Sequence, residues 1–297
     1  MTKMRKTIVF QGEPGANSDL ACRQAYPAYA PLPCPTFEDT LAAVRVGRAD
    51  LAMIPIENSV AGRVADIHHL MPHSGLNIVA EYFMPVHHQL LGTKGATLRT
   101  IKTVESHVHA LDQCRKAIRK FKLKRVVGAD TAGAAREVAE SKDRTRAAIA
   151  SMLAAKIHGL RILKRNVEDE AHNTTRFIVL SSKPGGIRRE KNRDVRRISE
   201  GIVTTFVFEV RNIPAALYKA LGGFATNGIN MTKLESYMLR GNFFATQFYV
   251  DVEGHPDDRA LKLAFEELEF VSQPGSFKIL GVYPAHPYRL ATAARRN

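Results

Sequence analysis

Short apolar segments alternate with helical segments along the first 183 residues, and this alternation is what most constrains the fold. Thr7–Phe10 and Leu51–Ile54 are short and apolar, which predicts buried strands. The segments at 19–26 and 37–46 have helical patterns instead, and Gly47 follows the second of them. A chain that alternates strands and helices in this way is typical of an α/β domain.

The chain forms a second set of alternating strands and helices and then returns to the first set. Strands predicted at 78–86 and 89–91 leave the first set, and a second set follows between residues 103 and 151. The chain then returns at His172–Phe177, which begins with polar residues and runs into an apolar strand. One lobe inserted within another, with two crossings between them, is typical of a hinged cleft.

Beyond residue 200 the order of elements changes to β-α-β-β-α-β, which is the ferredoxin-like order. The predicted strands are 202–210, 229–238, 243–252 and 277–283, and the predicted helices are 214–227 and 256–268. The segment 183–199 is rich in Gly, Arg and Lys, so we interpret it as a linker. We expect the tail after residue 284 to be disordered.

The composition excludes several classes of protein. The 297 residues are enough for two domains, and 45% apolar with 24% charged residues is usual for a soluble protein. No apolar run approaches the roughly 18 residues of a membrane span, and the N-terminal apolar run is too brief for a secretory signal. We therefore expect a cytoplasmic protein without a membrane partner. Cys22, Cys34 and Cys114 are interpreted as buried thiols.

A net charge of +14 raises the question of nucleic-acid binding. The cations gather at 115–125 and 188–197, where Phe121 is the single aromatic residue, so there is no alternation of cations with aromatics. A solvated face and a charged linker explain them better than a nucleic-acid interface. The same positive field favours capture of a small dianionic substrate.

Histidines cluster at His68, His69 and His73 and at His87 and His88. Pro72 breaks the helical spacing that a metal pair in the first cluster would need. The adjacent histidines of the second cluster point to opposite faces of a predicted strand. We therefore expect neither a metal site nor a cofactor.

Polar side chains follow the strand at Leu51–Ile54. Glu57, Asn58 and Ser59 supply a carboxylate, an amide and a hydroxyl in succession. Open α/β sheets bind ligands at the carboxyl ends of their strands, so we favour a functional role for these three residues.

Two turns ahead of helices have two interpretations each. The turn Gly12–Ser18 either binds a small anion through backbone amides or only turns the chain tightly. It lacks the dinucleotide fingerprint and the phosphate-loop lysine. In the turn Asp130–Ala134, Thr131 either caps the helix or contacts a ligand.

Four motifs together resemble the prephenate dehydratase family with a C-terminal ACT regulatory domain, over about residues 7–284. They are Gly12–Ser18, Pro55–Ser59, Ser106-His107 with Gln113-Cys114, and Asn173–Phe177. The resemblance implies an α/β catalytic domain with two lobes, like type II periplasmic binding proteins, followed by an α+β ferredoxin-like ACT domain. The implied boundaries are a catalytic domain at 1–183 (lobe 1 at 1–83 and 165–183, lobe 2 at 84–164), a linker at 184–200, the ACT domain at 201–284 and a tail at 285–297. Val108 stands where the family commonly has proline.

The resemblance also implies the reaction, which is loss of carbon dioxide and water from prephenate to give phenylpyruvate in phenylalanine biosynthesis. Thr175 matches the family's hydroxyl donor, and Glu57 is the competing acid. The implied substrate-binding residues are Asn58, Ser59, Ser106, Gln113, Thr131, Asn173 and Arg176. Strand alternation places Arg176 opposite Thr175, so its role is structural if it lies in the regular strand.

The ACT motifs are half altered here, as Ala215–Tyr218 and Glu235–Met238. The resemblance implies that Ala216, Leu217, Glu235 and Ser236 contact the effector L-phenylalanine at an interface between two copies, in a homodimer or homotetramer. Two alternatives stay open. One is an arogenate dehydratase, because the turns at 12–18 and 130–135 also resemble the plant enzymes. The other is a non-catalytic amino-acid sensor.

Overall fold

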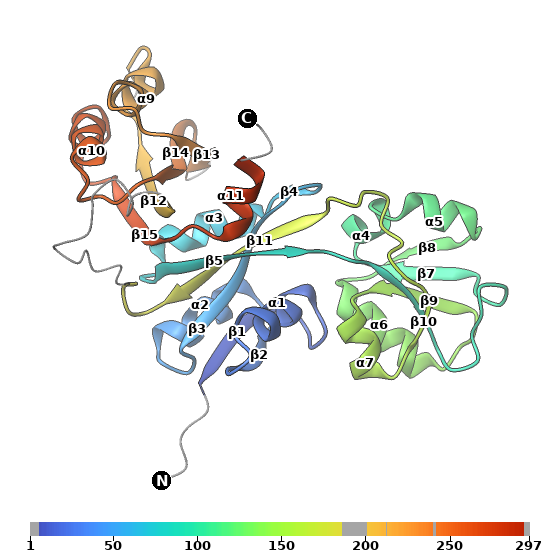
Figure 1. Cartoon of the computed structure of the whole chain (residues 1–297). Helices are drawn as coiled ribbons and strands as arrows, with labels where there is room; N and C mark the ends of the chain where they lie inside the picture. The colour runs from blue at the N-terminus through green and yellow to red at the C-terminus, as the bar shows by residue number, and fades with distance from the viewer. Residues whose placement is uncertain (1–5, 186–200, 212, 240–241, 294–297) are drawn as a thin grey trace, which may run out of the picture. The chain divides into compact units, whose positions relative to one another are not determined.

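The structure is a computed structural model and describes residues 6–185, 201–211, 213–239 and 242–293. The chain divides into an N-terminal unit (Met1–Ile67 with Tyr82–Phe177) and a C-terminal unit (His68–Glu81 with Ile178–Asn297). Strands β5 (Asn77–Pro85) and β11 (Thr174–Ser181) contribute residues to both units (Figure 1). Within the described ranges, no helix has the length and apolar character needed to cross a membrane.

The first lobe of the N-terminal unit has its strands in the order β2-β1-β3-β11. Its elements are β1 (Thr7–Gln11), α1 (Asn17–Ala25), β2 (Ala30–Cys34), α2 (Phe37–Arg45), β3 (Leu51–Asn58) and β4 (Gly62–Arg63), together with β11. β1 pairs in parallel with both β2 and β3, and its residues Ile8, Val9 and Phe10 are buried. The predicted α/β architecture is confirmed. Strand β2 is not evident from the sequence, and its two prolines are tolerated because it lies at the edge of the sheet.

Strand β3 continues to Asn58 rather than ending at Ile54 as the sequence predicted. A hairpin with β4 pairs Glu57 with Arg63 and Asn58 with Gly62, which extends the strand. Glu57 and Asn58 therefore lie in a regular strand and not in the turn after it. Successive strand residues point to opposite faces, so this correction separates two residues that the sequence had grouped.

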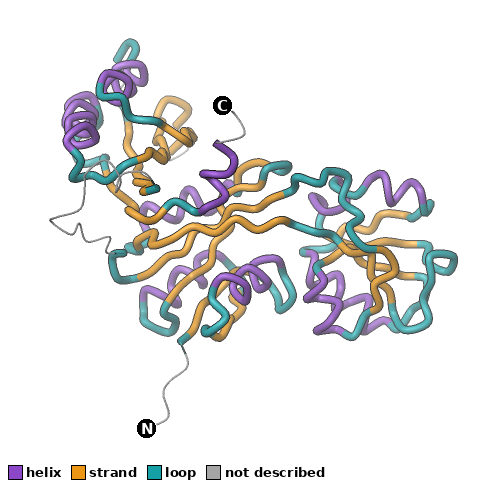
Figure 2. The backbone as a smooth tube through the Cα atoms, in the orientation of Figure 1, coloured by secondary structure: helices purple, strands orange, loops and turns teal. Residues whose placement is uncertain are grey.

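The second lobe is a sheet of five strands in the order β10-β6-β9-β7-β8. Its elements are β6 (Gln89–Gly92), β7 (Thr103–Ser106), α4 (Val108–Asp112), α5 (Arg115–Lys120), β8 (Lys124–Val127), α6 (Thr131–Ser141), β9 (Arg146–Ala150), α7 (Met152–His158) and β10 (Arg161–Lys164). Helices α4 and α5 cover one face and α6 and α7 the other (Figures 1 and 2). Alternate residues of β9 serve the two faces: Ala147 and Ile149 pack with α4 and α5, and Ala148 and Ala150 pack with α6 and α7.

The C-terminal unit contains the predicted β-α-β-β-α-β order, which confirms a ferredoxin-like fold. Its elements are β12 (Ile202–Glu209), α9 (Ala216–Thr226), β13 (Met231–Leu239), β14 (Asn242–Glu253), α10 (Arg259–Val271) and β15 (Lys278–Pro284), and the strands are ordered β13-β14-β12-β15. Both helices pack on one apolar core, in which the ring of Phe206 lies 5.7 Å from that of Phe224 and 5.1 Å from that of Phe265. Helix α3 (Ala65–Leu70) and the short 3₁₀ helix η1 (Met71–His73) precede β5.

The prediction of a disordered tail is wrong for Pro287–Ala293, which form helix α11. Arg289 of this helix donates to both carboxylate oxygens of Glu81, at 2.6 and 2.9 Å, and to Asp251 Oδ2 at 3.1 Å. Both carboxylate side chains are 0% exposed, and buried carboxylates require such a partner. Most of the predicted linker at 184–200 lies outside the described residues.

Candidate functional site

The side chains of Asn58 on β3 and Thr175 on β11 meet. Asn58 Nδ2 donates to Thr175 Oγ1 at 3.0 Å and to Asn173 Oδ1 at 2.7 Å. Asn173 is 2% exposed, and its Nδ2 donates to Gln113 Oε1 at 2.8 Å. Because Gln113 follows α4 in the second lobe, these three amide side chains connect the two lobes at Thr175.

Backbone hydrogen bonds fix the orientation of the Asn58 amide. Its Oδ1 accepts from the backbone nitrogens of Val60 and Ala61, at 3.0 and 2.8 Å. Backbone N–H groups only donate, so the amide oxygen faces them and the amide nitrogen faces Thr175. Thr175 Oγ1 therefore accepts a hydrogen bond from Asn58, and its own hydroxyl hydrogen can point to another acceptor.

Ser59 ties together the same two strand ends. Its Oγ donates to the His172 carbonyl at 2.8 Å and accepts from the Thr174 backbone nitrogen at 2.9 Å. Its own backbone nitrogen donates to the Thr174 carbonyl at 2.9 Å. Ser59 thus helps to hold β3 and β11 in the register that brings Asn58 to Thr175.

Glu57 and Arg176 lie on the opposite face of these strands. Arg176 Nη1 donates to Glu57 Oε1 at 2.9 Å, and the guanidinium lies 5.9 Å from the centre of the Phe83 ring. The Arg176 side chain is 2% exposed and lies within β11, the condition under which the sequence assigned it a structural role. Glu57 is therefore separated from Thr175 in position, on the other face of the sheet.

A further residue at the site is His88, which follows β5 and is 4% exposed. Its Nε2 lies 3.0 Å from Gln113 Oε1, and its backbone nitrogen donates to Glu168 Oε2 at 2.9 Å. His87 contacts the other oxygen of Glu168 at 2.8 Å. Burial lowers the pKa of His88, although the hydrogen bond to Gln113 and the charge of Glu168 act in the opposite direction. No motif spacing joins His88 to Gln113, so only the fold reveals their contact.

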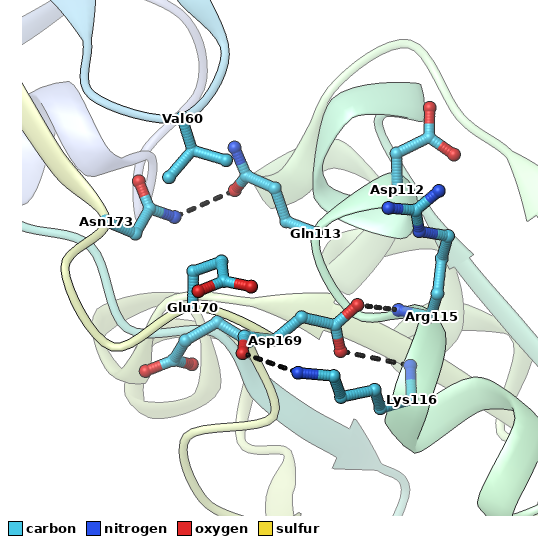
Figure 3. Close-up of a pocket in the computed structure, with 9 residues that line it drawn as sticks. Val60, Asp112, Gln113, Arg115, Lys116, Asp169, Glu170 and Asn173 are labelled. Atoms are coloured by element: carbon cyan, nitrogen blue, oxygen red, sulfur yellow. Dashed lines mark hydrogen bonds between the residues drawn. The ribbon is translucent and has the colours of Figure 1, made fainter.

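A hollow of about 130 Å³ lies beside the contact between Asn173 and Gln113 (Figure 3). Its lining carries amides and charges of both signs, from Val60, Asp112, Gln113, Arg115, Lys116, Glu168, Asp169, Glu170 and Asn173. The Asp169 carboxylate accepts from the backbone nitrogens of Arg115 and Lys116, each at 3.0 Å, where α5 begins. A hollow with a few convergent polar groups is suited to a small polar ligand.

The glycine-rich turn ahead of α1 joins the two lobes, so of its two interpretations the structure favours the tight turn. The Gly15 nitrogen donates to Asp19 Oδ2 at 2.9 Å, and the Gly15 carbonyl accepts from Ser151 Oγ at 2.6 Å. Glu13 accepts two hydrogen bonds from Arg136 of α6, at 2.9 and 3.1 Å. The hydrogen bond from Arg136 lowers the pKa of Glu13.

Two other predicted site residues have different surroundings. The Ser106 side chain is fully buried, and its hydroxyl donates to the Ile149 carbonyl at 2.6 Å, which is a structural hydrogen bond. Thr131 is the first residue of α6 and not its N-cap. Asp130 is the cap, because its Oδ1 accepts from two backbone N–H groups at 2.8 Å each.

The predicted effector residues lie in the C-terminal unit on two elements. Ala216 and Leu217 begin α9, after Ala215 in a left-handed conformation with φ of 58°. Glu235 and Ser236 lie on β13, where Lys233 Nζ donates to Glu235 Oε1 at 3.3 Å.

Comparisons with known proteins agree on one family. The family model for prephenate dehydratase matches residues 8–185. A bifunctional N-acyl-homoserine lactone acylase/prephenate dehydratase from Komagataeibacter europaeus is 53% identical over 96% of this chain and 98% of its own length. Arogenate dehydratase/prephenate dehydratase 1, chloroplastic, from Arabidopsis thaliana is 37% identical over 93% of this chain and 71% of its own length. The crystal structure of prephenate dehydratase from Arthrobacter aurescens in complex with L-Phe has a TM-score of 0.82 and 30% identity, and the match covers 97% of both chains.

Proposed function

This chain belongs to the prephenate dehydratase family, and we propose that it converts prephenate to phenylpyruvate in phenylalanine biosynthesis. The reaction breaks the bond to the ring carboxylate, which leaves as carbon dioxide, and the bond to the C4 hydroxyl. The electron pair released with carbon dioxide enters the ring, which becomes aromatic, while the departing hydroxide takes up one proton and leaves as water. The protein then has to supply that proton and hold the reacting groups in place.

Thr175 is the proposed proton donor, and the observation that carries this proposal is the hydrogen bond it accepts from Asn58. Because Oγ1 serves there as an acceptor, its own hydrogen can be directed at the leaving hydroxyl. A neutral hydroxyl suffices because aromatisation drives the reaction, and Thr175 afterwards regains its proton from solvent. Asn58, Ser59, Gln113, Thr131 and Asn173 are proposed to surround the substrate, while Ser106 and Arg176 support the site from buried positions.

Incubation of the purified chain with prephenate tests this proposal, because phenylpyruvate forms and is followed by its absorbance. We expect steady turnover without an added metal ion or cofactor. A chain that binds prephenate or phenylalanine but releases no phenylpyruvate would be a sensor, and the proposal would be wrong.

Glu57→Gln distinguishes the two candidate acids. Because Glu57 pairs with Arg176 on the face away from Thr175, we expect the acid limb of the kcat–pH profile to stay unchanged. Glutamine keeps an acceptor for the buried guanidinium but removes the opposite charge. The Glu57 side chain is 33% exposed, so the free energy of unfolding should fall by only roughly 1–2 kcal/mol in a urea titration. A flattened acid limb would make Glu57 the acid instead.

Arogenate is the second candidate substrate, and the carboxylates that line the hollow support it. Arogenate carries an ammonium group where prephenate has a keto oxygen. The hollow is lined by four carboxylates as well as by Arg115 and Lys116. Turnover of the two substrates side by side, compared as kcat/KM, distinguishes the two activities.

Hydrolysis of N-acyl-homoserine lactones is a separate candidate, because the relative with 53% identity carries acylase activity in its name. The assay is release of free homoserine lactone from a series of acyl chain lengths. Comparing Thr175→Val in both assays shows whether the two activities share a site.

We also propose that residues 1–183 form the catalytic domain and that residues 201–284 form an ACT domain. The ferredoxin-like fold supports this assignment, as does the relative crystallised in complex with L-Phe. L-phenylalanine would bind near Ala216, Leu217, Glu235 and Ser236, between copies of a homodimer or homotetramer. Inhibition assays and light scattering with and without L-phenylalanine test both statements. A monomer under both conditions contradicts the interface site.

Gly15→Ala should lower kcat/KM for prephenate by about 10- to 100-fold, because it disturbs the contact between the lobes. Gly15 has a φ of +93°, and a Cβ there would lie 2.8 Å from Ala154 Cα at the start of α7. Gly47→Ala is the matched control, since Gly47 has a φ of +75° but no atoms within 4 Å of the added carbon. Both variants carry backbone strain of about 1 kcal/mol or more, but only Gly15→Ala should change the kinetics.

A further inference from the structure

The direction of each hydrogen bond near Thr175 follows from the backbone donors at one end. Because Asn58 Oδ1 accepts from two backbone N–H groups, its Nδ2 must donate, and Asn173 must accept with Oδ1. The Nδ2 of Asn173 therefore donates to Gln113 Oε1. Since Gln113 presents this same oxygen to His88, the His88 Nε2 must carry the hydrogen. We call Asn58, Asn173, Gln113 and His88 the amide relay.

The amide relay fixes the orientation of Asn58 more firmly than that of Gln113. Val60 and Ala61 hold Asn58 through backbone groups, which cannot change their role. Gln113, in contrast, can rotate its amide and present nitrogen instead of oxygen, unless a second donor occupies the oxygen. A rotated Gln113 would turn the NH₂ group of Asn173 toward the NH₂ group of Asn58. Two donors would then face each other, and Asn58 would be displaced from Thr175.

We propose that His88 is a positioning residue, which holds Gln113 Oε1 toward Asn173 and thereby keeps Thr175 oriented as a hydrogen donor. This inference rests on the proposed function, in which Thr175 supplies the proton. His88 and Gln113 belong to the second lobe, whereas Asn58 and Thr175 belong to the first. The amide relay is therefore complete only while the two lobes are in contact, so lobe closure itself prepares the proton donor.

The state of the His88 ring agrees with this role. Glu168 and His87 are the charged or titratable groups that face it, and its deep burial lowers its pKa. The ring is therefore neutral near pH 7, with one hydrogen to give to Gln113. Because the unfolded chain takes up a proton at this position more readily than the folded chain, stability should fall as the pH drops below about 6.5.

The kinetics of three variants with prephenate test the proposal. His88→Leu removes the donor, His88→Gln supplies an amide N–H in its place, and His87→Leu is the matched control in the neighbouring position, where the side chain is 52% exposed. We expect His88→Leu to lower kcat about 10-fold or more with KM within about threefold. His88→Gln should recover most of kcat, and His87→Leu should behave like the unmodified chain.

A double-mutant cycle with Thr175→Val separates positioning from general damage. If His88 acts through Thr175, adding His88→Leu to Thr175→Val should reduce kcat by less than about twofold further. Equal losses in both backgrounds, or failure of His88→Gln to recover kcat, would overturn the role of His88. If Thr175→Val itself retains full kcat, Thr175 is not the proton donor, and the role of His88 through Thr175 is wrong although the chain is a dehydratase. The proposed function fails only if the unmodified chain forms no phenylpyruvate, so the two failures are distinguished.

Discussion

Thr175→Val should lower kcat for prephenate by about 100- to 10,000-fold, the usual contribution of a general acid. Valine keeps the branched shape of threonine, and β-branched residues suit the strand β11 in which Thr175 lies. The lost group is the hydroxyl that would donate to the departing hydroxide. Because that interaction develops in the transition state, KM should change by no more than a few-fold. Steady-state formation of phenylpyruvate gives both constants.

Thr175→Ser is the control for this prediction. Serine retains a hydroxyl that can accept from Asn58 and donate to the substrate, so kcat should stay within about tenfold of the unmodified value. If Thr175→Val and Thr175→Ser have the same kcat, the hydroxyl is not the proton donor and the proposed mechanism is wrong.

Arg289→Leu should lower the free energy of unfolding by about 3–5 kcal/mol, the usual loss when one partner of a buried ion pair is removed. Arg289 binds Glu81 and Asp251, whose carboxylates would remain in a nearly water-free environment. The backbone nitrogen of His286 also donates to Glu81 Oε1 at 3.0 Å, and Thr205 Oγ1 donates to Asp251 Oδ1 at 2.6 Å, but neutral donors do not cancel a charge. Urea denaturation followed by circular dichroism measures the change.

Two further variants separate charge from packing at this position. Arg289→Lys keeps the charge but loses the two-pronged contact with Glu81, so its stability should be intermediate. Combining Arg289→Leu with Glu81→Gln and Asp251→Asn removes the buried charges, and most of the lost stability should return. Unchanged stability of Arg289→Leu alone would mean that the ion pairs of α11 do not stabilise the C-terminal unit.

Local patterns in the sequence were enough to predict most of the elements. The strands and helices of the ferredoxin-like fold were found because apolar periodicity distinguishes them without knowledge of their partners. The extent of β3 was missed because β4, only two residues long, pairs with it after a turn. Helix α11 was missed because its polar contacts are with Glu81 and Asp251, which lie 208 and 38 residues away in the chain.

Site residues likewise could be predicted where a local pattern marks them, and not where their role depends on contacts distant in the sequence. Asn58, Asn173 and Thr175 stand at strand ends, where polar residues contrast with apolar neighbours, and the structure brings them together. The sequence groups Glu57 with Asn58 because it does not show where the strand ends. Their side chains point to opposite faces only because β3 continues to Asn58. In the sequence His88 is only one of two adjacent histidines, with no spacing that marks a site. Its role depends on Gln113, which no local pattern links to it.

The hairpin of β3 and β4 sets how this part of the chain can change during evolution. Insertion or deletion of one residue within β3 would shift the alternation and turn the carboxylate of Glu57 toward Thr175 in place of the amide of Asn58. Such a chain would still form the sheet, but the amide of Asn58 would no longer contact Thr175. We therefore expect this segment to tolerate substitutions but not insertions or deletions.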